Sequence, residues 1–121
     1  MVEAGGTVSA TTLSQGSTEY VYGADLQSTV KDGAYQYIES GGTASGTELV
    51  NGGREIVAAG GDTTGVFVFS NSVQIVESGG IATATFIDGL QGYQDVSGTA
   101  IDTTVNIGEQ LVRTVGQRPG L

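Results

Sequence analysis

The chain has 121 residues, among them 21 glycines and one proline, and it contains no cysteine, histidine or tryptophan. Four basic residues against 13 acidic ones give a formal net charge of −9. This charge argues against nucleic acid and anionic membranes as partners, because binding them requires clustered Lys and Arg. Without His and Cys the chain lacks the Ser-His-Asp, Cys-His and usual zinc constellations. We therefore predict no enzyme activity, no metal, no cofactor and no membrane insertion, since no apolar run approaches about 18 residues.

Imperfect copies of a unit of about nineteen residues fill the chain. Each copy starts at an aliphatic anchor, and successive anchors are 19, 17, 19, 19, 20 and 16 residues apart. The anchors are Val2, Val21, Ile38, Val57, Val76, Val96 and Val112. A Gly-Gly pair follows three residues after most anchors, and two copies shorten it to Gly23-Ala24 and Gly98-Thr99. Glycine suits tight corners because it adopts positive φ without steric cost.

Two further columns repeat at fixed positions. An aliphatic residue lies in mid-unit at Leu13, Val30, Leu49, Val68, Ile87 and Val105. Two residues before the next anchor comes Glu or Gln in every copy: Glu19, Gln36, Glu55, Gln74, Gln94 and Gln110. One unit cannot bury its own apolar residues, but stacked units bury each column as a continuous ladder. The period predicts an all-β solenoid of about six rungs over residues 1–112, with two or three strands per rung, and residues 113–121 as a tail or a link to further repeats.

The Glu/Gln column has two interpretations. We favour a structural ladder, in which stacked amides bond to one another and a carboxylate accepts N–H groups from the rungs beside it. Acid and amide alternate along the first four positions, which keeps like charges apart. The alternative is a pair of catalytic acids, which is weaker because Glu19 and Glu55 would lie two rungs apart, roughly 9–10 Å.

Aromatic residues interrupt the polar positions of two copies. Phe67 and Phe86 share a column that is otherwise occupied by Thr12, Thr29, Glu48 and Thr104. This column flanks an inward one, so it is expected to face outwards and to form a small apolar contact patch. The alternative is that both rings pack beneath a loop or along a second edge of the core. Tyr20 and Tyr37 are expected to stack beside their anchors.

The stretch GGTASGTELVNGGREIVAAGG, from Gly41 to Gly61, resembles the AIDA-type repeat of self-associating autotransporter adhesins. That repeat follows the pattern Gly-Gly-x-Ala-x-x-Thr-x-Val-x-x-Gly-Gly-x-Gln-x-Val-x-x-Gly-Gly. The matching positions here are Ala44, Thr47, Leu49, Gly52, Gly53 and Val57, with Glu55 at the Gln position. The resemblance covers nearly the whole chain, from Val2 to Val112, and is strongest in this unit.

The resemblance implies a right-handed parallel β-helix in an adhesin passenger domain at the outer-membrane surface of a Gram-negative bacterium. It also implies roles in cell adhesion, auto-aggregation and biofilm formation. Some members of the family are glycosylated by a heptosyltransferase on hydroxyls of the repeats. By position, the acceptors here are expected to be Ser9, Ser45, Thr64 and Thr83.

Several functions follow as hypotheses. The leading one is an adhesive module that binds other copies, neighbouring repeats, or a host receptor or glycan. The second is a substrate scaffold for glycosylation, and the third is a carbohydrate-binding or carbohydrate-processing β-helix. An ice-binding solenoid is disfavoured because Glu48, Phe67 and Phe86 interrupt the outward threonine column. Since neither end resembles a cap, we expect a longer array or an end-to-end partner.

Overall fold

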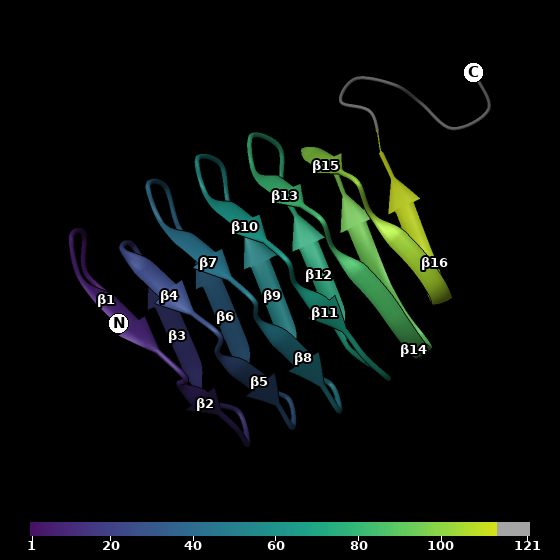
Figure 1. Cartoon of the computed structure of the whole chain (residues 1–121), viewed down its shortest axis with the longest axis horizontal. Helices are drawn as coiled ribbons and strands as arrows, with labels where there is room; N and C mark the ends of the chain where they lie inside the picture. The colour runs from purple at the N-terminus through teal and green to yellow at the C-terminus, as the bar shows by residue number, and fades with distance from the viewer. Residues whose placement is uncertain (114–121) are drawn as a thin grey trace.

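The computed structural model describes residues 1–113, in which sixteen β-strands and no helix are found. The strands wind around one axis, and every neighbouring pair in the ladders is parallel (Figure 1). Each turn of the coil, here called a rung, contributes a short stretch of strand to each of three walls. The predicted parallel β-solenoid is therefore confirmed, with three strand segments per rung.

The first wall is a six-stranded sheet formed by β1 (Thr7–Ser9), β4 (Ala24–Leu26), β7 (Thr43–Ser45), β10 (Asp62–Thr64), β13 (Ile81–Thr83) and β15 (Thr99–Ile101). The second contains β2 (Thr12–Leu13), β5 (Thr29–Lys31), β8 (Glu48–Val50) and β11 (Phe67–Val68). The third contains β3 (Thr18–Val21), β6 (Tyr35–Ile38), β9 (Arg54–Val57) and β12 (Val73–Val76). In the last two rungs β14 (Phe86–Val96) and β16 (Thr104–Val112) run through both the second and third walls, which joins them into one sheet.

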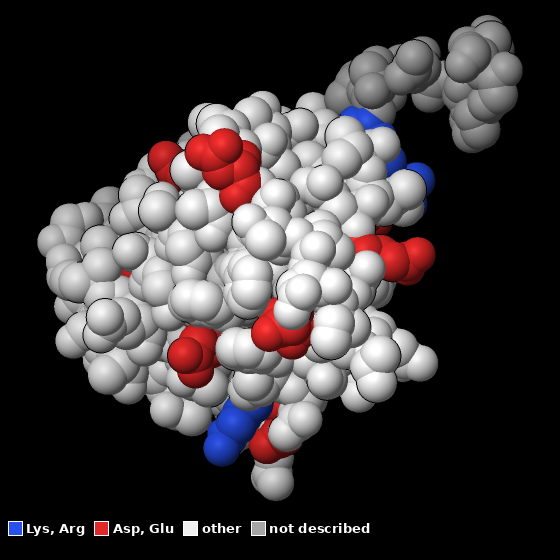
Figure 2. All heavy atoms as spheres, turned by 45° about the vertical axis from the view of Figure 1, so that its right-hand side comes forward, with Lys and Arg blue, Asp and Glu red and all other residues white. Residues whose placement is uncertain are grey.

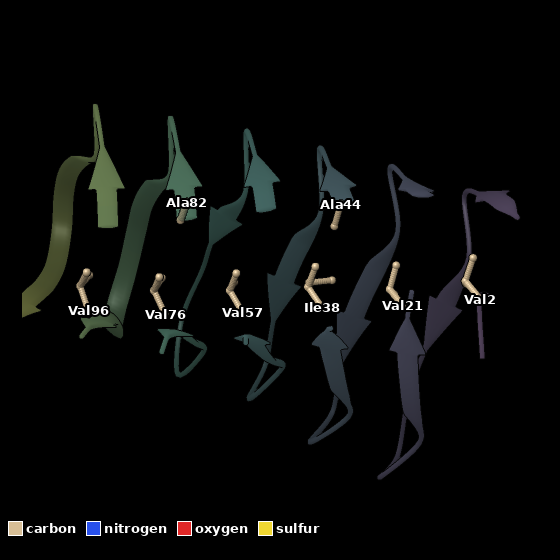
Figure 3. Close-up of a cluster of buried hydrophobic side chains, with 8 residues drawn as sticks. All are labelled: Val2, Val21, Ile38, Ala44, Val57, Val76, Ala82 and Val96. Carbon is tan, nitrogen blue, oxygen red and sulfur yellow. The ribbon is translucent and has the colours of Figure 1, made fainter. Parts of the chain in front are cut away.

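The anchor residues lie in register down the third wall. Val2 bridges to Val21, and each later anchor pairs with the one before it through to Val112. The first six anchors are buried and form one core cluster with Ala44 and Ala82 from the first wall (Figure 3). Unequal unit lengths are thus absorbed at the corners in the early rungs, whereas between β14 and β16 the difference is taken up by register shifts after Ile87 and Asp88.

A second core cluster contains the mid-unit column. Its buried members are Val30, Leu49, Val68 and Ile87, together with Ala34 and Val66. At the two ends of the described coil this column is less covered, because Leu13 is half-buried and Val105 is 41 % exposed. Side chains on each wall alternate between inside and outside, as the period of two along a strand requires.

The corner between the second and third walls depends on left-handed backbone. Asn51 and Gly52 have φ of 48° and 85°, and the equivalent Asp32 and Gly33 have φ of 54° and 78°. Two successive positive φ values are the requirement of a type I′ turn, which Asn-Gly and Asp-Gly tolerate best. These dipeptides thus set where the chain turns from one wall into the next.

The corner between the third and first walls varies in length. In the third rung it runs Glu39-Ser40-Gly41-Gly42, whereas in the second rung it is only Tyr22-Gly23. The two corners nevertheless lead into strands that are in register, because Ala24 at the start of β4 pairs with Thr43 at the start of β7. Loops project before β1, β7, β10 and β13 but not before β4 (Figure 1). The second rung is thus two residues shorter than its neighbour at this corner.

The predicted tail over residues 113–121 lies outside the described residues except for Arg113. The Arg113 Nε lies 2.9 Å from the Asp95 Oδ1, so Arg113 forms an ion pair with a residue of the neighbouring rung. Within residues 1–113 no helix is long and apolar enough to cross a membrane. The domain boundary at residue 112 stays a prediction.

Candidate functional site

The Glu/Gln column forms a polar ladder inside the coil. Register pairs join Glu19 to Gln36, Gln36 to Glu55, Glu55 to Gln74, Gln74 to Gln94, and Gln94 to Gln110. The first five side chains are buried, and only Gln110, in the last rung, is exposed. A polar column in this position is stable only if its members satisfy one another, because an unpaired buried polar group costs about 1–3 kcal/mol.

Hydrogen bonds in the ladder all have the same direction, with each amide donating to the preceding rung. The four bonds are Gln110 Nε2 to Gln94 Oε1 at 2.7 Å, Gln94 Nε2 to Gln74 Oε1 at 2.7 Å, Gln74 Nε2 to Glu55 Oε1 at 2.8 Å and Gln36 Nε2 to Glu19 Oε1 at 3.0 Å. An amide can continue such a chain because it carries both a donor and an acceptor, whereas an ionised carboxylate carries acceptors only.

Side chains from the other walls complete the network. The Thr85 Oγ1 donates to Gln74 Oε1 at 3.0 Å, and the Gln74 Nε2 also reaches Thr63 Oγ1 at 3.2 Å. At the start of the coil the Gln36 Nε2 donates to Asp25 Oδ2 at 2.6 Å, and the Ser28 hydroxyl donates to the other Asp25 oxygen. Asp25 is fully buried on the first wall, where other rungs place Ala44, Thr63 or Ala82. The sequence columns did not identify it as a ladder partner.

The chain of hydrogen bonds is interrupted between the second and third rungs. Gln36 Oε1 and Glu55 Oε2 are both buried without a hydrogen-bond partner within residues 1–113. Burial raises the pKa of the Glu55 carboxyl from 4.5 to about 7, the Gln74 hydrogen bond opposes this rise, and the charge of Asp25 adds to it. A proton on Glu55 would supply the donor that an amide supplies in other rungs.

The first rung carries a second perturbed carboxyl. Burial raises the pKa of Glu19 from 4.5 to about 7; a hydrogen bond with Asp25 raises it further, and the Gln36 hydrogen bond lowers it. Glu19 and Glu55 are separated by the rung that contains Gln36, so no space for a substrate lies between them. This arrangement favours the structural interpretation of the column over paired catalytic acids.

The expected glycosylation residues lie at the last position of their strands on the first wall. Register places Ser9, Leu26, Ser45, Thr64, Thr83 and Ile101 in one column. This column alternates with inward residues such as Ala44 and Ala82, so its side chains face outwards. Ser9 and Thr64 are exposed, and Ser45 and Thr83 are partly exposed. The hydroxyls of Ser45, Thr64 and Thr83 therefore occupy three consecutive rungs, while Leu26 separates them from Ser9.

The two phenylalanines are neighbours on the outside of the second wall. Phe67 and Phe86 are in register, with ring centroids 6.1 Å apart and planes at 78°. Phe67 is 38 % exposed. A third ring, Phe69, stacks on Phe67 at 6.1 Å and 6°. Phe69 was not predicted as part of the patch, although it lies two residues after Phe67 and so shares its face.

Tyrosines line the outside of the third wall at its N-terminal end. Tyr20 and Tyr37 stack with centroids 5.1 Å apart and planes at 15°. Tyr35 stacks on Tyr37 at 6.1 Å, and the Arg54 guanidinium lies 5.2 Å from the Tyr35 ring centroid and donates to its hydroxyl. The tyrosine stack was expected, whereas the contribution of Arg54 was not.

On the face shown in Figure 2, charged groups do not converge on a single site. Acidic side chains are scattered over the face shown in Figure 2, and basic ones appear there at separate places. Among the described residues no group of three or more His, Cys, Asp or Glu side chains is arranged to hold a metal ion.

Comparisons with known proteins identify a structural relative. No family model matches the chain, and no curated protein matches it by sequence. The chain is similar to the crystal structure of a TibC-catalysed, hyper-glycosylated fragment of TibA spanning residues 55–350 of that protein, with a TM-score of 0.69 and 30 % sequence identity. The match covers 94 % of this chain and 50 % of the TibA fragment, so this chain spans half the length of the solved fragment. The two share a repeat scaffold, which in TibA is glycosylated.

The ladder predicts how stability depends on pH. Because folding raises the pKa of Glu55, its protonated form stabilises the fold fully below pH 4.5, and this contribution is lost as the pH rises to about 7. The loss amounts to about 3 kcal/mol. We expect Glu55→Gln to remove most of this loss, since an amide donates at every pH. Urea denaturation of both proteins below pH 4.5 and above pH 7 measures the free energy of unfolding.

Glu48→Gln is the matched control, because Glu48 is an exposed glutamate on the second wall. It removes the same charge outside the ladder and is expected to leave the pH dependence unchanged. A Glu55→Gln variant that loses as much stability as the unmodified protein between the two pH values would contradict the assignment.

Proposed function

We propose that the chain is a repeat module of a bacterial cell-surface adhesin of the autotransporter type, exposed outside the cell and acting by self-association or surface attachment. Three observations support this proposal. The stretch from Gly41 to Gly61 resembles the AIDA-type repeat. The fold is a parallel β-solenoid, and its scaffold is similar to that of the glycosylated TibA fragment.

The solenoid supports such a role because its folding determinants lie inside the coil. Two apolar clusters and the polar ladder hold the rungs together, so outward positions are free to vary. One outward column of the second wall is polar in the first three rungs, at Thr12, Thr29 and Glu48, and becomes aromatic at Phe67 and Phe86. An outward aromatic cluster of which Phe67 is exposed supports a contact surface on this wall.

The single observation that carries the adhesive function is this cluster of Phe67, Phe69 and Phe86. Three rings on adjacent positions supply apolar area that water hydrates poorly, and aromatic residues are enriched at the centres of protein interfaces. A second copy that presents the same face would bury the rings against one another. Such an arrangement is isologous, as in most homodimers.

We expect the chain to self-associate with increasing concentration, as measured by sedimentation velocity. The double variant Phe67→Ser, Phe86→Ser is expected to weaken association at least tenfold, because it removes two outward rings and leaves the inward column of Val68 and Ile87 intact. Tyr20→Ser is the control: it removes an exposed aromatic from another wall. The proposal fails if the unmodified chain stays monomeric at every concentration, or if the double variant associates as strongly.

The similarity to the TibA fragment favours a second function, that of a glycosylation substrate. That fragment is hyper-glycosylated. In this chain the outward column with Ser9, Ser45, Thr64 and Thr83 presents hydroxyls at strand ends. Each of these residues directly precedes a corner residue with positive φ: Ala10, Gly46, Gly65 and Ala84, respectively. The hydroxyls are thus at the edge of the wall, where an enzyme can approach.

Co-expression with a heptosyltransferase and mass spectrometry of the intact chain test this function. We expect added sugar mass that maps to the four hydroxyls and disappears when all four are replaced by Ala. Replacement of the outward threonines of the second wall, Thr12, Thr29 and Thr104, is expected to leave the added mass unchanged. The absence of any mass increment on the unmodified chain would refute the acceptor assignment.

A further inference from the structure

A notch interrupts the ridge of corner loops that precedes the first wall. The corner of the second rung lacks the two residues that correspond to Ser40 and Gly41 of the third rung. The missing layer leaves a cavity of about 420 Å³ between the first and third corner loops. Its floor is the Gly23-Ala24 backbone, and Gly5 and Gly41 lie on its opposite walls. Cavities of roughly 300–1,000 Å³ are the size that holds small molecules.

The intact part of the ridge indicates which hydrogen bonds the notch leaves open. The Gly41 N–H donates to the Gly60 carbonyl at 3.0 Å, and the Gly60 N–H donates to the Gly79 carbonyl at 3.0 Å. The equivalent glycines have the same backbone conformation, with φ of 83° at Gly5, 85° at Gly41, 83° at Gly60 and 89° at Gly79. Each loop therefore donates its glycine N–H to the following loop.

At the notch, the second rung has no loop between the one that carries Gly5 and the one that carries Gly41. Within residues 1–113, the Gly5 N–H has no backbone acceptor and the Gly41 carbonyl has no backbone donor. The two walls of the notch thus present one free donor and one free acceptor that face the same missing layer. A side chain at Gly23 cannot fill it, because a Cβ there would lie 2.3 Å from the Gly6 carbonyl oxygen.

The geometry restricts what fits between these walls. Rungs in a solenoid are separated by about 4.8 Å, so an occupant of one missing layer is a flat group one layer thick. It has to offer an acceptor towards Gly5 and a donor towards Gly41. A trans secondary amide does both, because its C=O and N–H point in opposite directions across a planar group.

The surroundings of the notch favour a sugar as the carrier of this amide. Tyr22 lines the cavity and is 39 % exposed, which offers an aromatic surface to the apolar face of a sugar ring. Glu3 and Glu39 follow the anchors that pair with Val21 and so flank Tyr22 on the neighbouring rungs. Carboxylates accept hydrogen bonds from sugar hydroxyls and repel anionic ligands. The C=O and N–H of an acetamido group point in opposite directions, so this group fits the missing layer between Gly5 and Gly41 while the sugar ring that carries it lies beside it against Tyr22.

We propose that the notch between the first and third corner loops binds a neutral N-acetylated amino sugar through the Gly5 N–H, the Gly41 carbonyl and the ring of Tyr22. This inference deepens the proposed surface-adhesive function by naming a glycan site. The role of the site in adhesion rests on that function, whereas the binding of the sugar does not. Binding to the isolated chain tests it directly. Its outcome is therefore separate from the outcome of the sedimentation and glycosylation experiments.

Titration of the ¹⁵N-labelled chain with the methyl β-glycoside of N-acetylglucosamine is the test. Saturable shifts are expected at the Gly5 amide and at the Gly42 amide, which shares its peptide group with the Gly41 carbonyl. The Gly79 amide is an internal control, because it also has no backbone acceptor within residues 1–113 but borders the short corner at Gly98. Methyl β-glucoside, which lacks the acetamido group, is expected to bind at least tenfold more weakly.

Two variants provide matched controls. Insertion of Ser-Gly after Tyr22 restores the corner length of the third rung and fills the notch with the chain's own loop, so it is expected to abolish binding. The inserted loop is also expected to form backbone hydrogen bonds with the Gly5 N–H and the Gly41 carbonyl. Changed chemical shifts of the Gly5 and Gly42 amides would report these bonds. Tyr22→Ala is expected to weaken binding at least fivefold. In the absence of ligand, the chemical shifts of its Gly5 and Gly42 amides are expected to equal those of the unmodified chain.

Four results would overturn the inference. The first is the absence of saturable shifts at Gly5 and Gly42 with the N-acetylated sugar. The second is equal binding of methyl β-glucoside, which would exclude the amide contacts. The third is equal or tighter binding of a small amide without a ring, such as N-acetylglycine methylamide, which would assign the notch to a peptide segment. An insertion variant that folds and still binds would likewise refute the site.

Discussion

The register between successive rungs is the constraint on which the rest of this structure depends. The buried ladder of Glu and Gln side chains accepts only one register, because sliding a strand by one residue would turn each side chain to the opposite face. Apolar columns alone would tolerate a shift more readily, since aliphatic contacts are not directional. Amides that donate to the preceding rung add a direction to the stack. The hydrophobic clusters supply most of the burial, and the ladder makes the stacking specific.

This division of labour determines where function can lie. Inward positions are committed to packing, and both perturbed carboxyls, Glu19 and Glu55, belong to that interior. The outer faces differ from wall to wall: the first presents hydroxyls, the second a phenylalanine cluster and the third stacked tyrosines with Arg54. Corners add a further source of variation, because a rung that lacks two residues leaves the stack intact and opens a notch beside it. The scaffold can thus carry contact, modification and ligand sites without altered stacking.

The sequence predicted the fold well because the solenoid is periodic. Val57 and Val76 pair as their spacing requires, and the shortened second unit still places Ile38 on Val21. Features that occur once were not predicted. Asp25 replaces a small inward residue, so no column identifies it as the partner of Gln36. The opening beside Tyr22 depends on the length of neighbouring loops, which is a property of three rungs together. The exposure of Ser45 and Thr64 required the corner geometry, since alternation restarts after each corner.

The most direct test of the shared register is hydrogen exchange of the side-chain amides, followed by NMR in the folded chain. If Gln36, Gln74 and Gln94 bond to one another and to Glu55 and Glu19 inside the coil, their Nε2 protons exchange as slowly as the backbone amides of the β-strands. The exposed Gln15 and Gln91 provide the fast reference within the same molecule. Protection of the three ladder amides is the result that the structure predicts. Exchange as fast as that of Gln15 and Gln91 would contradict the ladder and the stacked register that depends on it.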